Sequence, residues 1–167
     1  MTTEQDKSHL LSEHTRGEID HWLTKFPYEG RQSASLQALM AAQHQNQGWV
    51  STDLMDAAAD YIDVPRISMY EVATFYSMIE TQPVARHSVS ICSNISCMLA
   101  GADDLVAHVE GRLGCKRGES TADGRIFLKQ EEECLAACSC APMMQVDHVY
   151  YTDLTPERVD EILDGLD

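Results

Sequence analysis

The chain has 167 residues, 44% of them hydrophobic, which suffices for one domain with a sizeable core or for a small domain with an added subdomain. Its 27 acidic and 12 basic residues give a formal net charge of −15, which argues against nucleic acid or an anionic lipid surface as a partner. No apolar run approaches the roughly 18 residues of a membrane helix, so we expect no direct membrane insertion. The opening MTTEQDKSHL carries no export or import signal, which indicates a cytoplasmic protein.

Helical periodicity runs through the first half of the chain and predicts short helices over residues 12–26, 36–48, 51–62 and 68–80. Ser12 is the expected N-cap of the first helix, and Gly48 suits a left-handed end to the second. Ser68 and Glu71 form a capping box at the start of the fourth. Because such short helices are not stable alone, we expect them to pack as an N-terminal helical bundle over residues 1–82.

After Pro83 the apolar residues alternate with period two, which predicts strands. The expected elements are strands at 87–92, 125–130, 143–147 and 149–154, a helix at 102–112 and a final helix capped by Thr155. Asp147 and His148 are the expected hairpin turn between the last two strands. This order indicates an α/β sandwich over residues 83–167, so the whole chain is predicted to be of the α+β class.

All six cysteines lie between Cys92 and Cys140. Because a reducing cytoplasm does not sustain structural disulfides, metal, cluster or thiol redox chemistry is the expected reason for them. Cys92 and Cys97 stand where a strand ends and a helix begins, and Cys134 and Cys138 follow another strand. Two such pairs on neighbouring loops supply four thiolates, the number that a 2Fe-2S cluster needs.

The spacing of the cysteines leaves other sites open. A structural zinc ion also accepts four cysteines, although neither pair has the CxxC spacing of a zinc ribbon. Thiol–disulfide chemistry or plain packing are further alternatives. Cys115 is expected to behave as a small buried apolar residue, whereas Cys140, two residues from Cys138, is a possible replacement ligand. None of the seven histidines lies between the paired cysteines, and His87, His108 and His148 stand on separate elements, which favours surface or supporting positions.

The sequence contains no P-loop, no GxGxxG stretch and no Ser/His/Asp grouping. We therefore expect no catalytic residues, no nucleotide site and no substrate pocket in this chain.

Several stretches together resemble one protein family. They are GWV at 48–50, EVATFYSM at 71–78, QPVARH at 82–87, the C-x4-C pair, LGCKRGESTADGRIFL at 113–128 and ECLAACSCAPMMQVD at 133–147. In these motifs the chain resembles the small 2Fe-2S subunit of NADH:quinone oxidoreductase, respiratory complex I, and the resemblance covers nearly the whole length.

The resemblance implies a thioredoxin-like ferredoxin domain after the helical part, and it assigns the ligand role to Cys92, Cys97, Cys134 and Cys138. It implies a one-electron carrier beside a partner subunit that binds FMN and NADH, together with a large iron–sulfur subunit. The complex would hold the chain at the inner face of the plasma membrane. Related subunits of NAD-linked hydrogenases and formate dehydrogenases share these motifs, so they remain alternative assignments. In every case the isolated chain is expected to be inactive with NADH.

Two features depart from the family. Ala136 stands where the family usually has glycine, and a positive φ there would cost alanine about 1 kcal/mol or more. Cys140 adds a thiol near the expected cluster. The helical part has no chemistry of its own, so docking to the flavin subunit, or scaffolding of the ferredoxin domain, is its expected role.

Overall fold

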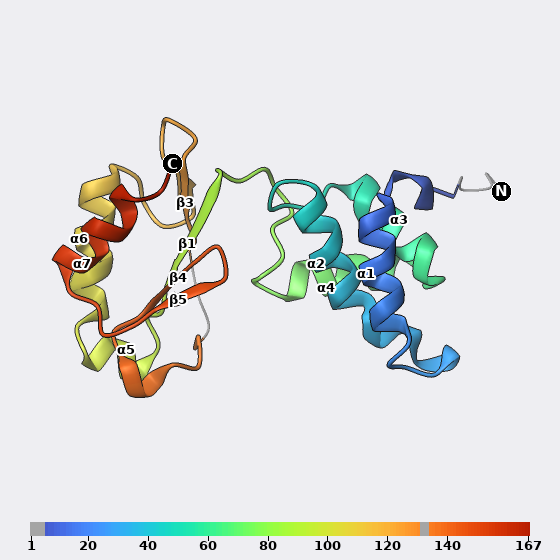
Figure 1. The fold of residues 1–167 in the computed structure, drawn as a ribbon, viewed down its shortest axis with the longest axis horizontal. Helices are drawn as coiled ribbons and strands as arrows, with labels where there is room; N and C mark the ends of the chain where they lie inside the picture. Colours follow the sequence, from blue (N-terminus) through green and yellow to red (C-terminus); the bar gives the residue numbers. More distant parts are fainter. Residues whose placement is uncertain (1–5, 131–133) are drawn as a thin grey trace. The chain divides into compact units, whose positions relative to one another are not determined.

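The computed structural model describes residues 6–130 and 134–167. The chain divides between Pro83 and Val84 into two compact units (Figure 1). Within the described residues, no helix combines the length and the apolar character needed to cross a membrane. The mixture of helices and one sheet makes the protein α+β, as predicted.

The N-terminal unit consists of helices alone. They are the 3-10 turns η1 (Ser8–Leu10) and η2 (Tyr28–Ala34) and the α-helices α1 (Glu13–Leu23), α2 (Ser35–Gln45), α3 (Thr52–Ile62) and α4 (Arg66–Phe75). Ile19, Leu39, Ile62 and Met69 are completely buried between them. Three consecutive alanines of α3, Ala57–Ala59, lie in the hydrophobic core of this unit, where their small side chains allow the helices to pack closely.

The helix starts follow the expected capping chemistry at two places. The Ser12 side chain accepts a hydrogen bond from the Thr15 N–H at the start of α1, and Ser51 does the same for Leu54 at the start of α3. Each bond satisfies a backbone donor that has no partner inside the helix. Asp63, with φ of 57°, ends α3 in the left-handed region.

The fourth helix corrects two expectations. It begins at Arg66 rather than at Ser68, whose backbone N–H already donates to the Pro65 carbonyl within the first turn. Pro65 fixes the backbone before the helix, and Arg66 forms a bidentate ion pair with Asp60, so the helix starts two residues before the predicted capping box. The helix also ends at Phe75 instead of continuing to residue 80, because Tyr76 is extended.

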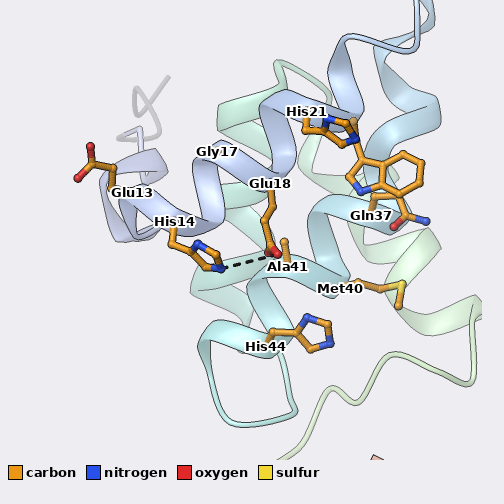
Figure 2. A pocket seen from close by; sticks show the side chains of 10 residues that line it. Glu13, His14, Gly17, Glu18, His21, Gln37, Met40, Ala41 and His44 are labelled. Atoms are coloured by element: carbon orange, nitrogen blue, oxygen red, sulfur yellow. Dashed lines mark ion pairs between the residues drawn. The ribbon is translucent and has the colours of Figure 1, made fainter. Parts of the chain in front are cut away.

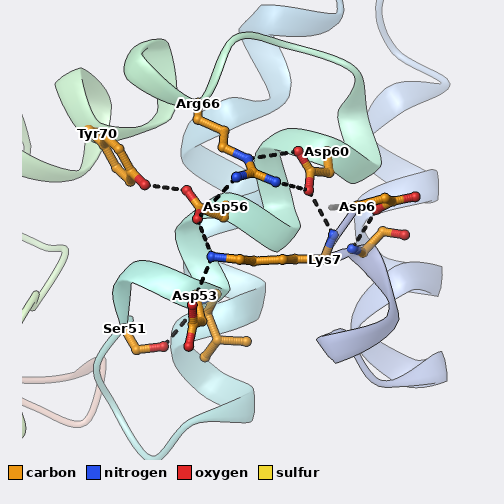
Figure 3. Close-up of polar contacts among 10 residues, drawn as sticks. Asp6, Lys7, Ser51, Asp53, Asp56, Asp60, Arg66 and Tyr70 are labelled. Atoms are coloured by element: carbon orange, nitrogen blue, oxygen red, sulfur yellow. Dashed lines mark hydrogen bonds and ion pairs between the residues drawn. The ribbon is translucent and has the colours of Figure 1, made fainter. Parts of the chain in front are cut away.

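A polar network ties the beginning of the described chain to α3 and α4 (Figure 3). The backbone N–H of Lys7 donates to Asp60, 2.8 Å away, and its ammonium group pairs with Asp56. Asp56 is only 4% exposed and also accepts from the Tyr70 hydroxyl and faces Arg66. Burial opposes the charge of Asp56, but the hydrogen bonds from Lys7 and Tyr70 and the charge of Arg66 outweigh it and lower its pKa.

The C-terminal unit is a five-stranded sheet with helices. The strands are β1 (His87–Ile91), β2 (Glu119–Ser120), β3 (Ile126–Leu128), β4 (Met144–Val146) and β5 (Val149–Tyr151), in the order β2-β3-β1-β4-β5. β1 pairs parallel with β3, and all other neighbours are antiparallel. The helices are α5 (Ile95–Leu99), α6 (Ala102–Leu113) and α7 (Pro156–Asp164), with the 3-10 turn η3 (Cys138–Cys140). The central position of β1 fixes the point from which the first cysteine loop leaves the sheet.

The local signals in this unit behave as expected. Asp147 and His148 both have positive φ, 47° and 70°, in the tight turn between β4 and β5. The Thr155 side chain caps α7 by accepting from the Arg158 N–H, with Pro156 at the first helical position. Figure 1 shows α6 and α7 side by side. The Nε2 atom of His108 on α6 lies 2.8 Å from a carboxylate oxygen of Asp160 on α7.

Candidate metal centre

The first pair of cysteines belongs to the buried part of the C-terminal unit. Cys92 directly follows β1, and its backbone N–H donates to the Met143 carbonyl, 3.2 Å away. Cys97 lies on α5, where the Asn94 side chain accepts from the first helical N–H. Both thiols are buried, each residue being 2% exposed, and they pack with Ala102 and Met143 in a small apolar cluster.

The second pair lies on a loop at the surface. Cys134 and Cys138 are exposed, and their sulfur atoms are 3.3 Å apart. The Ala136 N–H points at the Cys134 sulfur, 3.4 Å away. Ala136 reaches this position with φ of 61°, in the left-handed region that costs a residue with a Cβ. The positive φ considered from the sequence is therefore present.

The two pairs meet. Leu135 and Ala137 of the loop pack against the cluster that contains the buried thiols. Burial raises the pKa of Cys97 to about 11, and a hydrogen bond and charge from Cys92 and the nearby charge of Cys138 act in the same direction. The structure thus places the segment of Cys134 and Cys138 against the apolar cluster that contains Cys92 and Cys97.

The donor set fits a 2Fe-2S cluster. Four thiols are present in two pairs, and this cluster takes two cysteine ligands for each iron. Among residues 6–130 and 134–167, no three histidine, cysteine, aspartate or glutamate side chains are arranged to hold a metal ion, so this fit rests on the number and the pairing of the thiols. Backbone N–H groups such as that of Ala136 already point at sulfur, as they do around bound clusters, where they help to offset thiolate charge.

The remaining cysteines have different surroundings. Cys115 lies in the main core of the sheet unit at 8% exposure, and burial raises its pKa. This matches the expectation of a small buried apolar residue. The Cys140 thiol contacts the hydroxyl of Ser139 at 3.6 Å, and its carbonyl accepts from the Asp153 N–H. Cys140 is therefore part of the loop that carries Cys138, but its thiol is directed to a different neighbour.

The sequence patterns do not reveal two features of the structure. Met143, whose carbonyl accepts the hydrogen bond from the Cys92 N–H, was expected only as a strand residue. Its position in the sequence close to the second cysteine pair was the available signal.

An open groove of about 500 Å³ between α1 and α2 was also not predicted (Figure 2). It is lined by residues that include His14, His21 and His44. The Nε2 atom of His14 lies 3.7 Å from a carboxylate oxygen of Glu18. These histidines do not form a group that could hold a metal ion.

Comparison with known proteins agrees with this geometry. Residues 19–167 match the family model described as thioredoxin-like [2Fe-2S] ferredoxin. The chain is 40% identical over 144 residues to the E subunit of NADH-quinone oxidoreductase from Rickettsia bellii, covering 86% of each chain. It is 39% identical over 150 residues to the E 2 subunit of the same enzyme from Rhizobium meliloti, covering 90% of this chain and 87% of that one.

The fold is also similar to solved structures. An NAD+-reducing [NiFe]-hydrogenase in its air-oxidized state aligns with a TM-score of 0.62 and 22% identity over 75% of this chain. The aligned part is 22% of the hydrogenase chain, so the present chain spans about a fifth of that protein. At this identity the likeness concerns the fold. The family match and the extensive sequence identities show that the chain belongs to the thioredoxin-like [2Fe-2S] ferredoxin family, among the E subunits of NADH-quinone oxidoreductase.

Proposed function

We propose that the chain holds one 2Fe-2S cluster through Cys92, Cys97, Cys134 and Cys138 and carries single electrons in the NADH-oxidising module of NADH:quinone oxidoreductase. The observation that carries this proposal is that the segment with the two exposed thiols packs against the cluster with the two buried thiols, in a chain of this family. In this proposal residues 83–167 form the cluster-binding domain, and residues 1–82 form a helical subdomain without redox chemistry.

The chain's residues have separate tasks at this centre. The bound cluster supplies reversible one-electron redox chemistry. Cys92 and Cys97 hold it from the sheet and α5, where their positions are fixed by packing. Cys134 and Cys138 hold it from the loop, and the Ala136 N–H donates to sulfur and offsets thiolate charge, which helps to set the reduction potential. No side chain has to transfer a proton or a hydride.

The proposed partners are those that the resemblance to the complex I subunit implies. They are an FMN- and NADH-binding subunit, which delivers the electrons, and a large iron–sulfur subunit of the same module. Through them the chain would lie peripherally at the inner face of the plasma membrane. Because the sequence has no nucleotide-binding motif, the isolated chain with its cluster should not oxidise NADH. Rapid oxidation by the purified chain would contradict the carrier role.

A second assignment has its own support. The equivalent subunits of NAD-linked hydrogenases and formate dehydrogenases share the sequence motifs, and an NAD+-reducing hydrogenase has the same fold. Purification of the complex from its natural source separates these assignments, because the accompanying large subunits differ. A structural zinc module is the remaining alternative, which metal analysis addresses directly.

The test combines cofactor analysis with a matched series of variants. The purified chain should contain iron and acid-labile sulfide in equal amounts and give a rhombic EPR signal after reduction. Cys92→Ser, Cys97→Ser, Cys134→Ser and Cys138→Ser should each lose or distort that signal. Cys115→Ser and Cys140→Ser are the controls and should retain it. Stoichiometric zinc without sulfide would reject the cluster. Loss of the signal with Cys140→Ser, while Cys138→Ser retains it, would show that the fourth ligand is misassigned.

A further inference from the structure

We propose that Asp153 is a positioning residue for the ligand Cys138, because its left-handed backbone holds the cysteine loop, residues 134–142, against the rest of the C-terminal unit. Asp153 lies between β5 and α7, in a segment that we name the anchor turn, residues 152–155. The proposal rests on the function proposed above. It concerns how the second pair of thiols keeps its place.

The anchor turn donates two backbone hydrogen bonds to the cysteine loop. The Asp153 N–H donates to the Cys140 carbonyl, 3.0 Å away. The Leu154 N–H donates to the Pro142 carbonyl, also at 3.0 Å. Cys140 is the last residue of η3, the short turn that begins with Cys138. The bond from Asp153 therefore ends on the turn that carries the proposed ligand.

The backbone conformation of Asp153 allows both bonds to reach one loop. Its φ is 51°, in the left-handed region. In an extended chain, successive backbone N–H groups point to opposite sides. A residue in the left-handed region instead turns its own N–H and the next one toward the same side, as in the nests that bind anions. An extended residue at position 153 would therefore lose one of the two bonds.

The anchor turn is itself fixed to the core of the unit. Leu154 is 5% exposed and packs in the main core of the sheet unit. Thr155 caps α7 by accepting from the Arg158 N–H. Asp153, in contrast, is exposed. A substitution there acts through its charge and its backbone preference, and these two effects can be separated.

The test compares Asp153→Gly, Asp153→Ala and Asp153→Val in the cluster-loaded full chain. All three variants remove the same carboxylate, so a difference between them reports the backbone and not the charge. Glycine adopts positive φ freely, alanine does so at a cost, and β-branched valine is the least suited to it.

We expect the half-life of the bound cluster, followed by its visible absorbance, to be at least about fivefold shorter with valine than with glycine. Alanine should lie between them. The reduction potential and the EPR g-values should depart from those of the glycine variant in the same order. If the valine variant does not fold, as judged by far-UV circular dichroism, the comparison of alanine with glycine decides.

Two controls separate positioning from a general loss of stability. Gln47 is exposed and has a φ of 58° in the N-terminal unit, so Gln47→Val introduces the same kind of strain away from the cysteine loop. Val159→Ala removes buried apolar volume from the core that Leu154 joins, without changing the anchor turn. Both controls should leave the reduction potential and the EPR g-values unchanged.

Amide hydrogen exchange examines the anchor turn without the cluster. In the cluster-free chain, the N–H groups of Asp153 and Leu154 should exchange slowly in the wild type and in Asp153→Gly, because both are hydrogen-bonded. They should exchange faster in Asp153→Val. Equal exchange in all three proteins would contradict the proposed anchoring.

The outcomes distinguish the two proposals. Equal half-lives, potentials and g-values for the three Asp153 variants would overturn the positioning role and leave the carrier function standing. The positioning role would also fail if Val159→Ala changed these quantities as much as Asp153→Val does. Absence of iron and sulfide from the wild-type chain would overturn the proposed function itself, and the ligand role of Cys138 with it.

Discussion

The strained backbone at Ala136 leads to a quantitative prediction. Its φ of 61° is left-handed, which costs an L-residue about 1–2 kcal/mol. Ala136→Gly removes this strain but adds about 0.4–1 kcal/mol of chain entropy to the unfolded state. The free energy of unfolding should therefore rise by about 0.5–1 kcal/mol, even though the substitution removes a methyl group.

Ala137→Gly is the matched control, because the neighbouring residue has a φ of −108° and no such strain to release. It should lower the free energy of unfolding by about 0.4–1 kcal/mol, so the two variants should differ by about 1–2 kcal/mol.

Urea denaturation of the reduced, cluster-free chain, followed by far-UV circular dichroism, measures both variants of this loop. Trp22 and Trp49 fluorescence reports the N-terminal unit separately and should not change. Equal effects of the two substitutions would refute the assignment of strain to residue 136.

Three further predictions concern other parts of the chain. Asp56→Asn should lower the free energy of unfolding by about 1–3 kcal/mol, because it removes the buried carboxylate that accepts from Tyr70 and pairs with the partly exposed Lys7 and Arg66; thermal denaturation measures this. A hydrogen bond to Asp147 raises the pKa of His87, so this pair stabilises the fold fully below about pH 6.5 and less as pH rises through the raised pKa. His87→Gln should remove that decline from a pH series of unfolding measurements. In the cluster-free chain, iodoacetamide should modify Cys134 and Cys138 before the buried cysteines, which mass spectrometry detects; equal rates would contradict the described burial.

Local sequence patterns are informative wherever one short stretch determines the structure. Ser12 and Ser51 mark helix starts because the capping bond involves a residue only three positions away. The turn at Asp147 and His148 and the cap at Thr155 are predictable for the same reason. The spacing within each cysteine pair can likewise be read from a short stretch of sequence. The packing of one pair's segment against the other pair cannot, because it depends on the fold.

The features that the patterns miss depend on distant contacts. The start of α4 is determined by Asp60 on the preceding helix, which binds Arg66 and outweighs the local signal at Ser68. β2 has only two residues, and its position depends on pairing with β3. The five-residue helix α5 is too short to show a period and is recognisable only from its packing around Cys97.

The unequal burial of the two cysteine pairs has a consequence for how long a cofactor stays in the protein. Cys92 is continuous with the central strand, which is hydrogen-bonded on both sides, so releasing it requires disruption of the sheet. Cys134 and Cys138 lie on an exposed loop, and such segments open locally at much lower free energy than a whole domain. The lifetime of the bound group should therefore depend on opening of the loop, and changes that tighten residues 134–142 should lengthen it without altering the melting temperature of the sheet.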